Sequence, residues 1–155
     1  MAEALLRHAL EANAEGNSEK SLSSSVQRVH APDSDLAVES LSAGVYAGEG
    51  MPASQHSVEA LDDLGIDLRY FRSQPVTPEL IDSCDLIFAM TRQHRDTLVE
   101  WFPEVREKVF LIKEFADPST TADVADPYSL DLSVYRRCRD EIRACIPGIV
   151  KFLKQ

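Results

Sequence analysis

Two short, continuous apolar runs, with a helical pattern between them, constrain the fold of this chain more than any other feature. They cover residues 86–90 and 109–112, and the pattern between them predicts a helix over residues 92–101. Continuous runs of this length suit strands that are buried on both faces, as parallel sheets require. Because strands alternate with helices along the chain, we expect an α/β fold of three layers around a parallel sheet.

Residues that start or stop helices place the other elements. Ser54 can cap one helix, Gly65 can end it, and Thr77 followed by a proline and a glutamate is a strong helix start. Pro147 is expected to kink or interrupt the last helix before the tail. The further elements that the spacing predicts are helices over residues 1–13, 55–64, 78–83 and 132–146 and a strand over residues 36–41.

Length and composition bound the remaining possibilities. The 155 residues suit one domain, residues 1–155, in which the polar and partly serine-rich residues 14–35 are expected to form a flexible loop or insertion. The net charge of −10 argues against nonspecific binding to nucleic acid or to an anionic membrane. The sequence shows neither a signal peptide nor an apolar run of membrane-spanning length, so we expect a cytoplasmic protein.

Three places in the sequence could carry chemistry beyond the carboxyl ends of the strands, where open parallel sheets bind their ligands. They are Ser42-Ala43-Gly44, Met90-Thr91 and Lys113-Glu114. The loop at Asp126-Pro127-Tyr128 could reach the same edge. The three cysteines are odd in number and form no CxxC pair, which argues against a disulfide framework and against a zinc site.

Several motifs, in order and at matching spacing, resemble one family. They are Met1-Ala-Glu-Ala-Leu-Leu6, Ser42-Ala43-Gly44, Ala89-Met90-Thr91, Val124-Ala-Asp126-Pro127-Tyr128, and Tyr135 followed by Arg139-Asp140-Glu141-Ile142. Together they resemble the low-molecular-weight protein-tyrosine phosphatases. The stretches at residues 89–94 and 126–142 are most similar to the bacterial protein-arginine phosphatase branch.

The resemblance implies a phosphotyrosine protein phosphatase I-like fold and hydrolysis of a phosphorylated protein substrate, on phosphotyrosine or phosphoarginine, through a cysteinyl-phosphate. It implies that Asp126 is the general acid, that Tyr128 lines the substrate slot and that Ser42 supports the phosphate loop. It implies neither a metal nor an organic cofactor. Each residue also has a plainer interpretation, in which Asp126 starts a turn, Tyr128 is a loop tyrosine and Ser42 ends a strand.

One motif of that family is not found among these 155 residues. Its members use a cysteine followed six positions later by an arginine. In this chain no arginine is found six positions after a cysteine. The residues there are Met90 after Cys84, Ala144 after Cys138 and Lys151 after Cys145. The family's loop and its first, central strand would lie before Met1. We therefore expect no activity from the chain as written, and exposed strand edges that favour oligomerisation.

Two explanations of this difference remain open at the level of sequence. Either the start of the chain was placed too late, at the methionine of the first helix, or the protein is a non-catalytic binding or regulatory relative. We favour the first explanation, because without the central strand two buried strand edges would lose their ladder partners. Each unpaired buried backbone group costs ~1–3 kcal/mol, which is large against a typical stability of ~5–15 kcal/mol.

Two further groups of residues have a structural and a functional interpretation. Arsenate reductases of the same fold use a redox cysteine pair, but Cys138 and Cys145 on one face of the last helix are interpreted as core residues. Arg92, His94 and Arg95 follow a strand end and could contact a substrate, although a charged helix surface is the simpler interpretation.

Overall fold

Two parallel strands form the centre of the molecule. The computed structural model describes residues 1–14, 29–30, 37–116 and 123–155. Within them β3 (Ile87–Ala89) pairs in parallel with β4 (Val109–Leu111), with Ile87 opposite Val109 and Ala89 opposite Leu111. The helix α4 (Arg92–Trp101) forms the crossover between the two strands. The predicted pair of buried parallel strands and the helix between them are confirmed.

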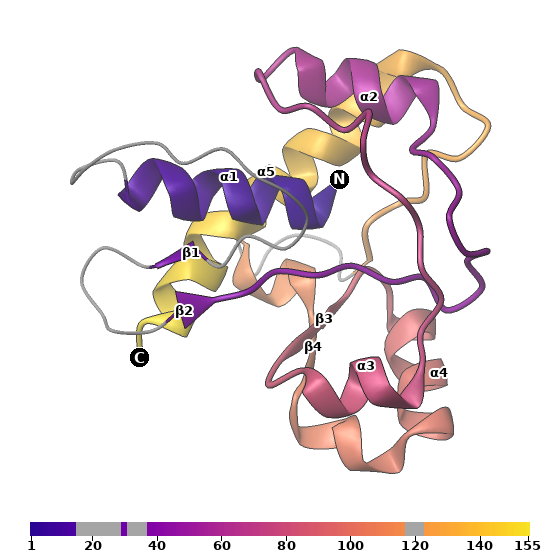
Figure 1. Cartoon of the computed structure of the whole chain (residues 1–155), viewed down its shortest axis with the longest axis vertical. Helices are drawn as coiled ribbons and strands as arrows, with labels where there is room; N and C mark the ends of the chain where they lie inside the picture. Colours follow the sequence, from indigo (N-terminus) through magenta and orange to yellow (C-terminus); the bar gives the residue numbers. More distant parts are fainter. Residues whose placement is uncertain (15–28, 31–36, 117–122) are drawn as a thin grey trace.

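Helices cover both faces of this strand pair and make three layers (Figure 1). Alternate strand residues point to opposite sides. Ala89, Val109 and Leu111 are buried in one apolar cluster with Ile81 of α3 (Pro78–Ser83) and Leu98 of α4. Phe88 and Met90 contact the other cluster, which is described next. The three-layer α/β fold expected from the sequence is therefore present.

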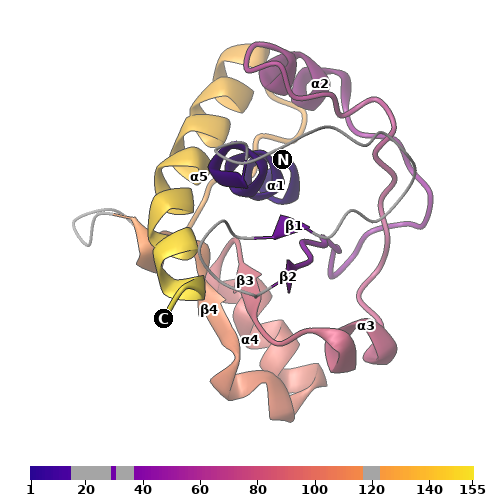
Figure 2. The same ribbon diagram turned by 60° about the vertical axis from the view of Figure 1, so that its left-hand side comes forward.

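The second cluster lies between the strands and three helices, namely α1 (Ala2–Ala14), α2 (Gln55–Asp62) and α5 (Leu132–Leu153). In Figure 1 α1 crosses in front of α5, and in Figure 2 it lies beside the middle of that helix. The buried members that the helices supply are Leu5, Leu61, Cys138, Ile142, Cys145, Ile146 and Ile149. The long amphipathic helix predicted near the C-terminus thus forms one wall of the main core.

The predicted helix starts are confirmed by their capping bonds. The Ser54 side chain accepts a hydrogen bond from the Ser57 amide, and the Thr77 side chain accepts one from the Leu80 amide. Gly65 has φ +73°, a left-handed conformation that glycine adopts without strain, and it follows α2 as predicted.

The predicted strand at residues 36–41 is shorter and differently paired than expected. It contains only β2 (Ala37–Val38), which pairs antiparallel with β1 (Val29–His30), with Val29 opposite Val38. A strand needs a ladder partner for its amides and carbonyls, and β1 supplies one from nearby in the sequence. β1 falls inside residues 14–35, which were predicted as a loop; residues 15–28 and 31–35 lie outside the described residues.

Of the two effects expected of Pro147, a kink or an interruption of the last helix, the interruption is wrong, because α5 continues to Leu153. A proline removes one amide and displaces the carbonyl four residues earlier. Pro147 and Arg143 are both exposed, so water can bind the carbonyl that is released. Gly148 then allows the helix to pass close to Phe115, because a Cβ atom at Gly148 would lie 2.1 Å from the Phe115 carbonyl oxygen.

Gly148→Ala is expected to destabilise the protein by about 1–3 kcal/mol, since the helix must move away from Phe115. Replacing a glycine by alanine at an open helix position would instead raise the free energy of unfolding by about 1 kcal/mol. Urea unfolding followed by circular dichroism measures the change. Gly48→Ala is the control, because its nearest neighbour is a flexible Met51 side chain 3.7 Å away. Equal stability of the two variants would contradict this account.

The strands have edges without a ladder partner in the described part of the chain. There β3 pairs with β4 alone, and β2 pairs with β1 alone. Exposed strand edges favour pairing between molecules, so we expect the 155-residue chain to form dimers or larger species. Size-exclusion chromatography with light scattering tests this expectation, and a homogeneous species at the monomer mass of 17.3 kDa would contradict it.

Candidate functional site

The segment before Asp126 is attached to the carboxyl end of β3. The Val124 amide donates a hydrogen bond to the Met90 carbonyl at 2.9 Å. One residue earlier, the Asp123 carboxylate accepts a hydrogen bond of 2.8 Å from the Arg92 amide. These two bonds attach the segment before Asp126 to the strand end, so the Asp-Pro loop reaches the edge at which ligands of such sheets bind.

Residues 124–130 form a compact turn that we call the acid loop. The Asp126 side chain is exposed, and its Oδ1 accepts a hydrogen bond from the Tyr128 amide at 3.0 Å. Pro127 is buried, and its carbonyl accepts a bond of 3.0 Å from the Leu130 amide. The turn interpretation of Asp126 is therefore correct as local structure. It is compatible with a chemical role, because the second carboxylate oxygen can carry a proton.

The acid loop has a helix cap at its far end. The Asp131 carboxylate accepts hydrogen bonds from the amides of Ser133 and Val134 and so starts α5. The Ser133 hydroxyl, which donates to the same carboxylate at 2.6 Å, holds the pKa of Asp131 below its usual range, and the two amide bonds add to this effect. Asp126 thus lies between two aspartates that are each fixed to a helix start.

Ser42 joins the end of the β2 segment to the first turn of α1. Its hydroxyl donates a 2.6 Å hydrogen bond to Glu3 Oε2, and its carbonyl accepts one of 2.8 Å from the Gln74 side chain. Glu3 also pairs with Arg7 one turn along the helix. Sequence reasoning did not single out Glu3, although an acidic residue in the first turn of a helix is a common signal for that helix end.

The Cys138 thiol lies in the main core, where burial disfavours its charged form and raises its pKa. The pKa of the Cys138 thiol is raised to about 11, mainly by burial and then by the charge of Glu141. The Met1 amino group opposes this shift, while Asp126 adds to it. Met1 and Val124 pack in the same core cluster as Cys138, so the start of α1 and the segment before Asp126 border one core.

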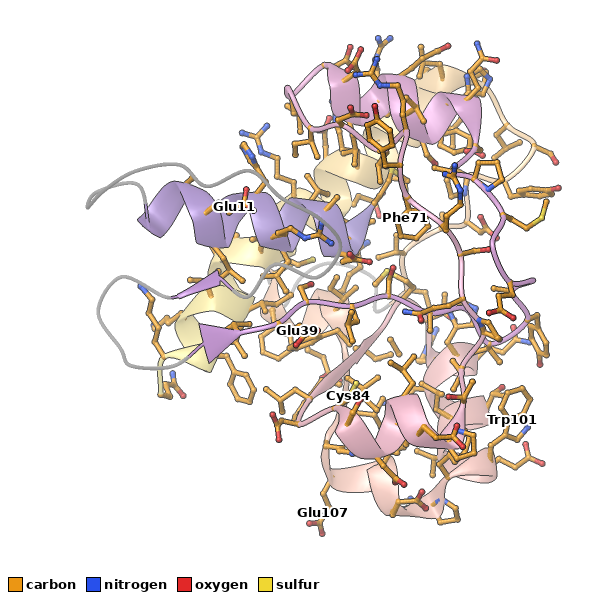
Figure 3. The ribbon with its side chains drawn as sticks, viewed as in Figure 1. Glu11, Glu39, Phe71, Cys84, Trp101 and Glu107 are labelled. Carbon is orange, nitrogen blue, oxygen red and sulfur yellow. The ribbon has the colours of Figure 1, made fainter. Side chains whose placement is uncertain are left out.

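None of the three cysteines has the surroundings of a nucleophile. All three are free thiols, and burial raises the pKa values of both Cys138 and Cys145. A thiolate, not a thiol, attacks phosphorus, and nucleophilic cysteines have lowered pKa values. Figure 3 shows Cys84 beside α3, on the approach to β3, and thus at the opposite end of that strand from Met90. The interpretation of Cys138 and Cys145 as core residues agrees with this geometry.

Charged side chains at the start of α4 pair within the molecule. The Arg92 guanidinium lies 3.4 Å from the Asp123 carboxylate, and Arg95 lies 3.2 Å from Asp96. Thr91 caps α4 by accepting a bond from the His94 amide. Elsewhere, the described residues contain no cluster of His, Cys, Asp or Glu that could hold a metal ion. No helix of the described residues is long and apolar enough to cross a membrane.

Ser42→Ala is expected to destabilise the protein by about 1–3 kcal/mol, because it removes a donor from the carboxylate of Glu3. Only 12% of the Glu3 side chain is exposed, so water replaces the donor poorly. Thermal unfolding of Ser42→Ala, Glu3→Ala and the double variant measures the coupling between the two side chains. The double variant should lose less stability than the sum of the single losses; strict additivity would show that the contact contributes nothing.

Comparison with known proteins agrees with this geometry. The profile of the family described as "Low molecular weight phosphotyrosine protein phosphatase" matches residues 14–155. The chain is 40% identical over 117 residues to the protein-arginine-phosphatase of Geobacillus stearothermophilus, covering 76% of this chain and 78% of the relative. It is 30% identical over 103 residues to the probable low molecular weight protein-tyrosine-phosphatase EpsP of Ralstonia nicotianae, covering 66% and 68%.

A solved structure shows the same fold. The crystal structure of a YwlE mutant from Bacillus subtilis superposes with a TM-score of 0.77 at 35% identity, over 99% of this chain and 88% of that one. The family expected from the sequence motifs is thereby confirmed. The chain belongs to the low molecular weight phosphotyrosine protein phosphatase family.

Proposed function

We propose that these residues form a protein-arginine phosphatase domain apart from its nucleophile loop. The complete domain hydrolyses the P–N bond of phosphoarginine in a protein substrate. The observation that carries the proposal is the attachment of the segment before Asp126 to the end of β3, through the Val124–Met90 and Asp123–Arg92 hydrogen bonds. The choice of phosphoarginine over phosphotyrosine is supported by the 40% identity to an arginine phosphatase, against 30% to a probable tyrosine phosphatase.

Asp126 has the role of general acid in this proposal. When a thiolate attacks phosphorus and the bond to the leaving group breaks, the leaving nitrogen or oxygen gains an electron pair and needs a proton. Asp126 is exposed on a short, anchored turn, so its carboxyl group can approach a leaving group from solvent. The carboxyl group transfers its proton to that atom and remains as a carboxylate.

Tyr128 and Ser42 have supporting roles. Tyr128 is 77% exposed, two residues after the acid, and its ring can form an aromatic wall for the substrate. Ser42 already donates its hydroxyl hydrogen to Glu3, so its oxygen is left to accept a hydrogen bond from a neighbouring phosphate loop. Neither role requires a metal or an organic cofactor.

The nucleophile is the part of the reaction that these 155 residues do not supply. None of the three cysteines is followed six positions later by arginine, and the buried thiols have raised pKa values. The chain as written is therefore proposed to be inactive until a strand that ends in a Cys-x5-Arg loop joins the site. Three unpaired cysteines suit a reducing compartment, and we place the protein in the cytoplasm.

A non-catalytic binding or regulatory domain is the second candidate, and the absence of the Cys-x5-Arg pattern is the observation that favours it. Such a domain would bind a phosphorylated protein without hydrolysing it. Arsenate reduction is disfavoured, because Cys138 and Cys145 are buried in the core and lie on the last helix.

The function is tested by comparing the 155-residue chain with a chain extended at Met1 by a strand and a Cys-x5-Arg loop. We expect no turnover of phosphoarginine peptide or para-nitrophenyl phosphate by the shorter chain, and turnover by the extended one. Asp126→Ala in the extended chain should lower kcat on phosphoarginine peptide by about 10²-fold or more.

The outcomes separate the two candidate functions. Turnover by the unextended chain that is lost on Asp126→Ala would overturn the proposed inactivity. A folded extended chain that binds phosphoarginine peptide but does not hydrolyse it would support the non-catalytic function instead. Cys→Ser in the added loop is the control, since it keeps the segment and removes the nucleophile.

A further inference from the structure

The acid loop is fastened to the strand end by a side chain to which the mechanism above gives no role. The Asp123 carboxylate accepts a 2.8 Å hydrogen bond from the amide of Arg92, the first residue of α4, 31 positions away in the sequence. Helix amides at this position have no partner within their own helix. The Thr91 side chain accepts a hydrogen bond from the His94 amide, so Asp123 and Thr91 each satisfy one amide in the first turn of α4.

The neighbouring residue adds a second bond to the same strand end. The Val124 amide donates to the Met90 carbonyl at 2.9 Å, and the Val124 side chain is buried in the main core. Met90 and Arg92 flank Thr91, so Asp123 and Val124 contact the chain on both sides of the helix cap. A rotation of the acid loop about its attachment would have to break both bonds.

We propose that Asp123 is a positioning residue for Asp126: its carboxylate ties the acid loop to the first turn of α4 and sets where the Asp126 carboxyl group stands. The inference rests on the proposed acid role of Asp126, and it names the residue that orients that acid. Asp123 itself touches no reacting atom. A shift of about 1 Å in a catalytic group is enough to cost a large part of the rate.

The charge of Asp123 supports this role. The hydrogen bond from the Arg92 amide holds the pKa of Asp123 below its usual range, and the Arg92 side chain lowers it further. Arg92 and His94 are the charged and titratable groups that face the carboxylate. Because the folded-state pKa is lowered, the tether is complete above the pKa of an unfolded aspartate and is lost as the pH falls through the folded value.

Amide hydrogen exchange in the 155-residue chain tests the tether directly. Asp123→Ala should raise the exchange rates of the Arg92 and Val124 amides by about tenfold or more, since it removes a bond to a charged acceptor. Asp123→Asn keeps an acceptor oxygen and should retain most of the protection. Arg92→Ala removes the guanidinium but keeps the backbone amide, so it should leave the exchange of Val124 nearly unchanged.

A pH series separates a tether from general support of the fold. In the original chain, protection of the Arg92 amide, relative to its intrinsic exchange rate, should fall in acid together with the protonation of Asp123. In Asp123→Asn that step should be absent. Melting temperatures establish that each variant is folded. Unchanged protection of Arg92 and Val124 in a folded Asp123→Ala variant would overturn the proposal.

The effect on Asp126 is measured in the extended chain with two substrates. Phenyl phosphate releases a phenol that needs a proton, whereas para-nitrophenyl phosphate releases a stable phenolate. Asp123→Ala should lower kcat on phenyl phosphate by about tenfold or more relative to para-nitrophenyl phosphate, with little change in KM, and Asp123→Asn should restore most of the loss.

The two substrates also distinguish failure of this inference from failure of the proposed function. If Asp126→Ala lowers kcat equally on both substrates, Asp126 is not the acid, and the positioning role falls with it. If Asp126→Ala discriminates between the substrates while Asp123→Ala does not, Asp126 remains the acid and only the positioning role is overturned.

Discussion

The parallel pair of β3 and β4 is the contact on which the rest of this structure depends. Its three paired residues on each strand are too few to be stable alone, and they persist because apolar side chains cover both faces. One face is closed by α3 and α4, and the other by α1, α2 and α5. The strand pair therefore fixes the positions of the helices, and its carboxyl end is a defined edge at which a site can form.

The candidate site is assembled from that edge by a small number of polar contacts. Asp123 and Val124 attach the acid loop to the residues around Thr91, and Asp131 attaches the other end of the loop to α5. Ser42 attaches the β2 segment to the first turn of α1 through Glu3. Each of these attachments consists of only one or two hydrogen bonds.

The buried cysteines show how the same core limits the chemistry. Cys138 and Cys145 lie in the apolar cluster beneath the site, where burial disfavours the thiolate. Their environment stabilises the fold and suppresses reactivity at neutral pH. Neither thiol has the lowered pKa that backbone amides and a positive charge give to a nucleophilic cysteine.

The sequence alone determined the layers, the strand pair and most helix starts, because apolar periodicity and capping residues act locally along the chain. Its motifs indicated the family by resemblance. It also identified Asp126, Tyr128 and Ser42 as candidates through their motifs. Only the tertiary structure decided the antiparallel pairing of β2 with β1, the continuation of α5 through Pro147, and the contacts of Asp123 and Glu3. The contacts of Asp123 and Glu3 join residues that are distant in the sequence, and the pairing of β2 depends on which segment lies beside it. The course of α5 depends on which side of the helix faces water, and no local pattern encodes these properties.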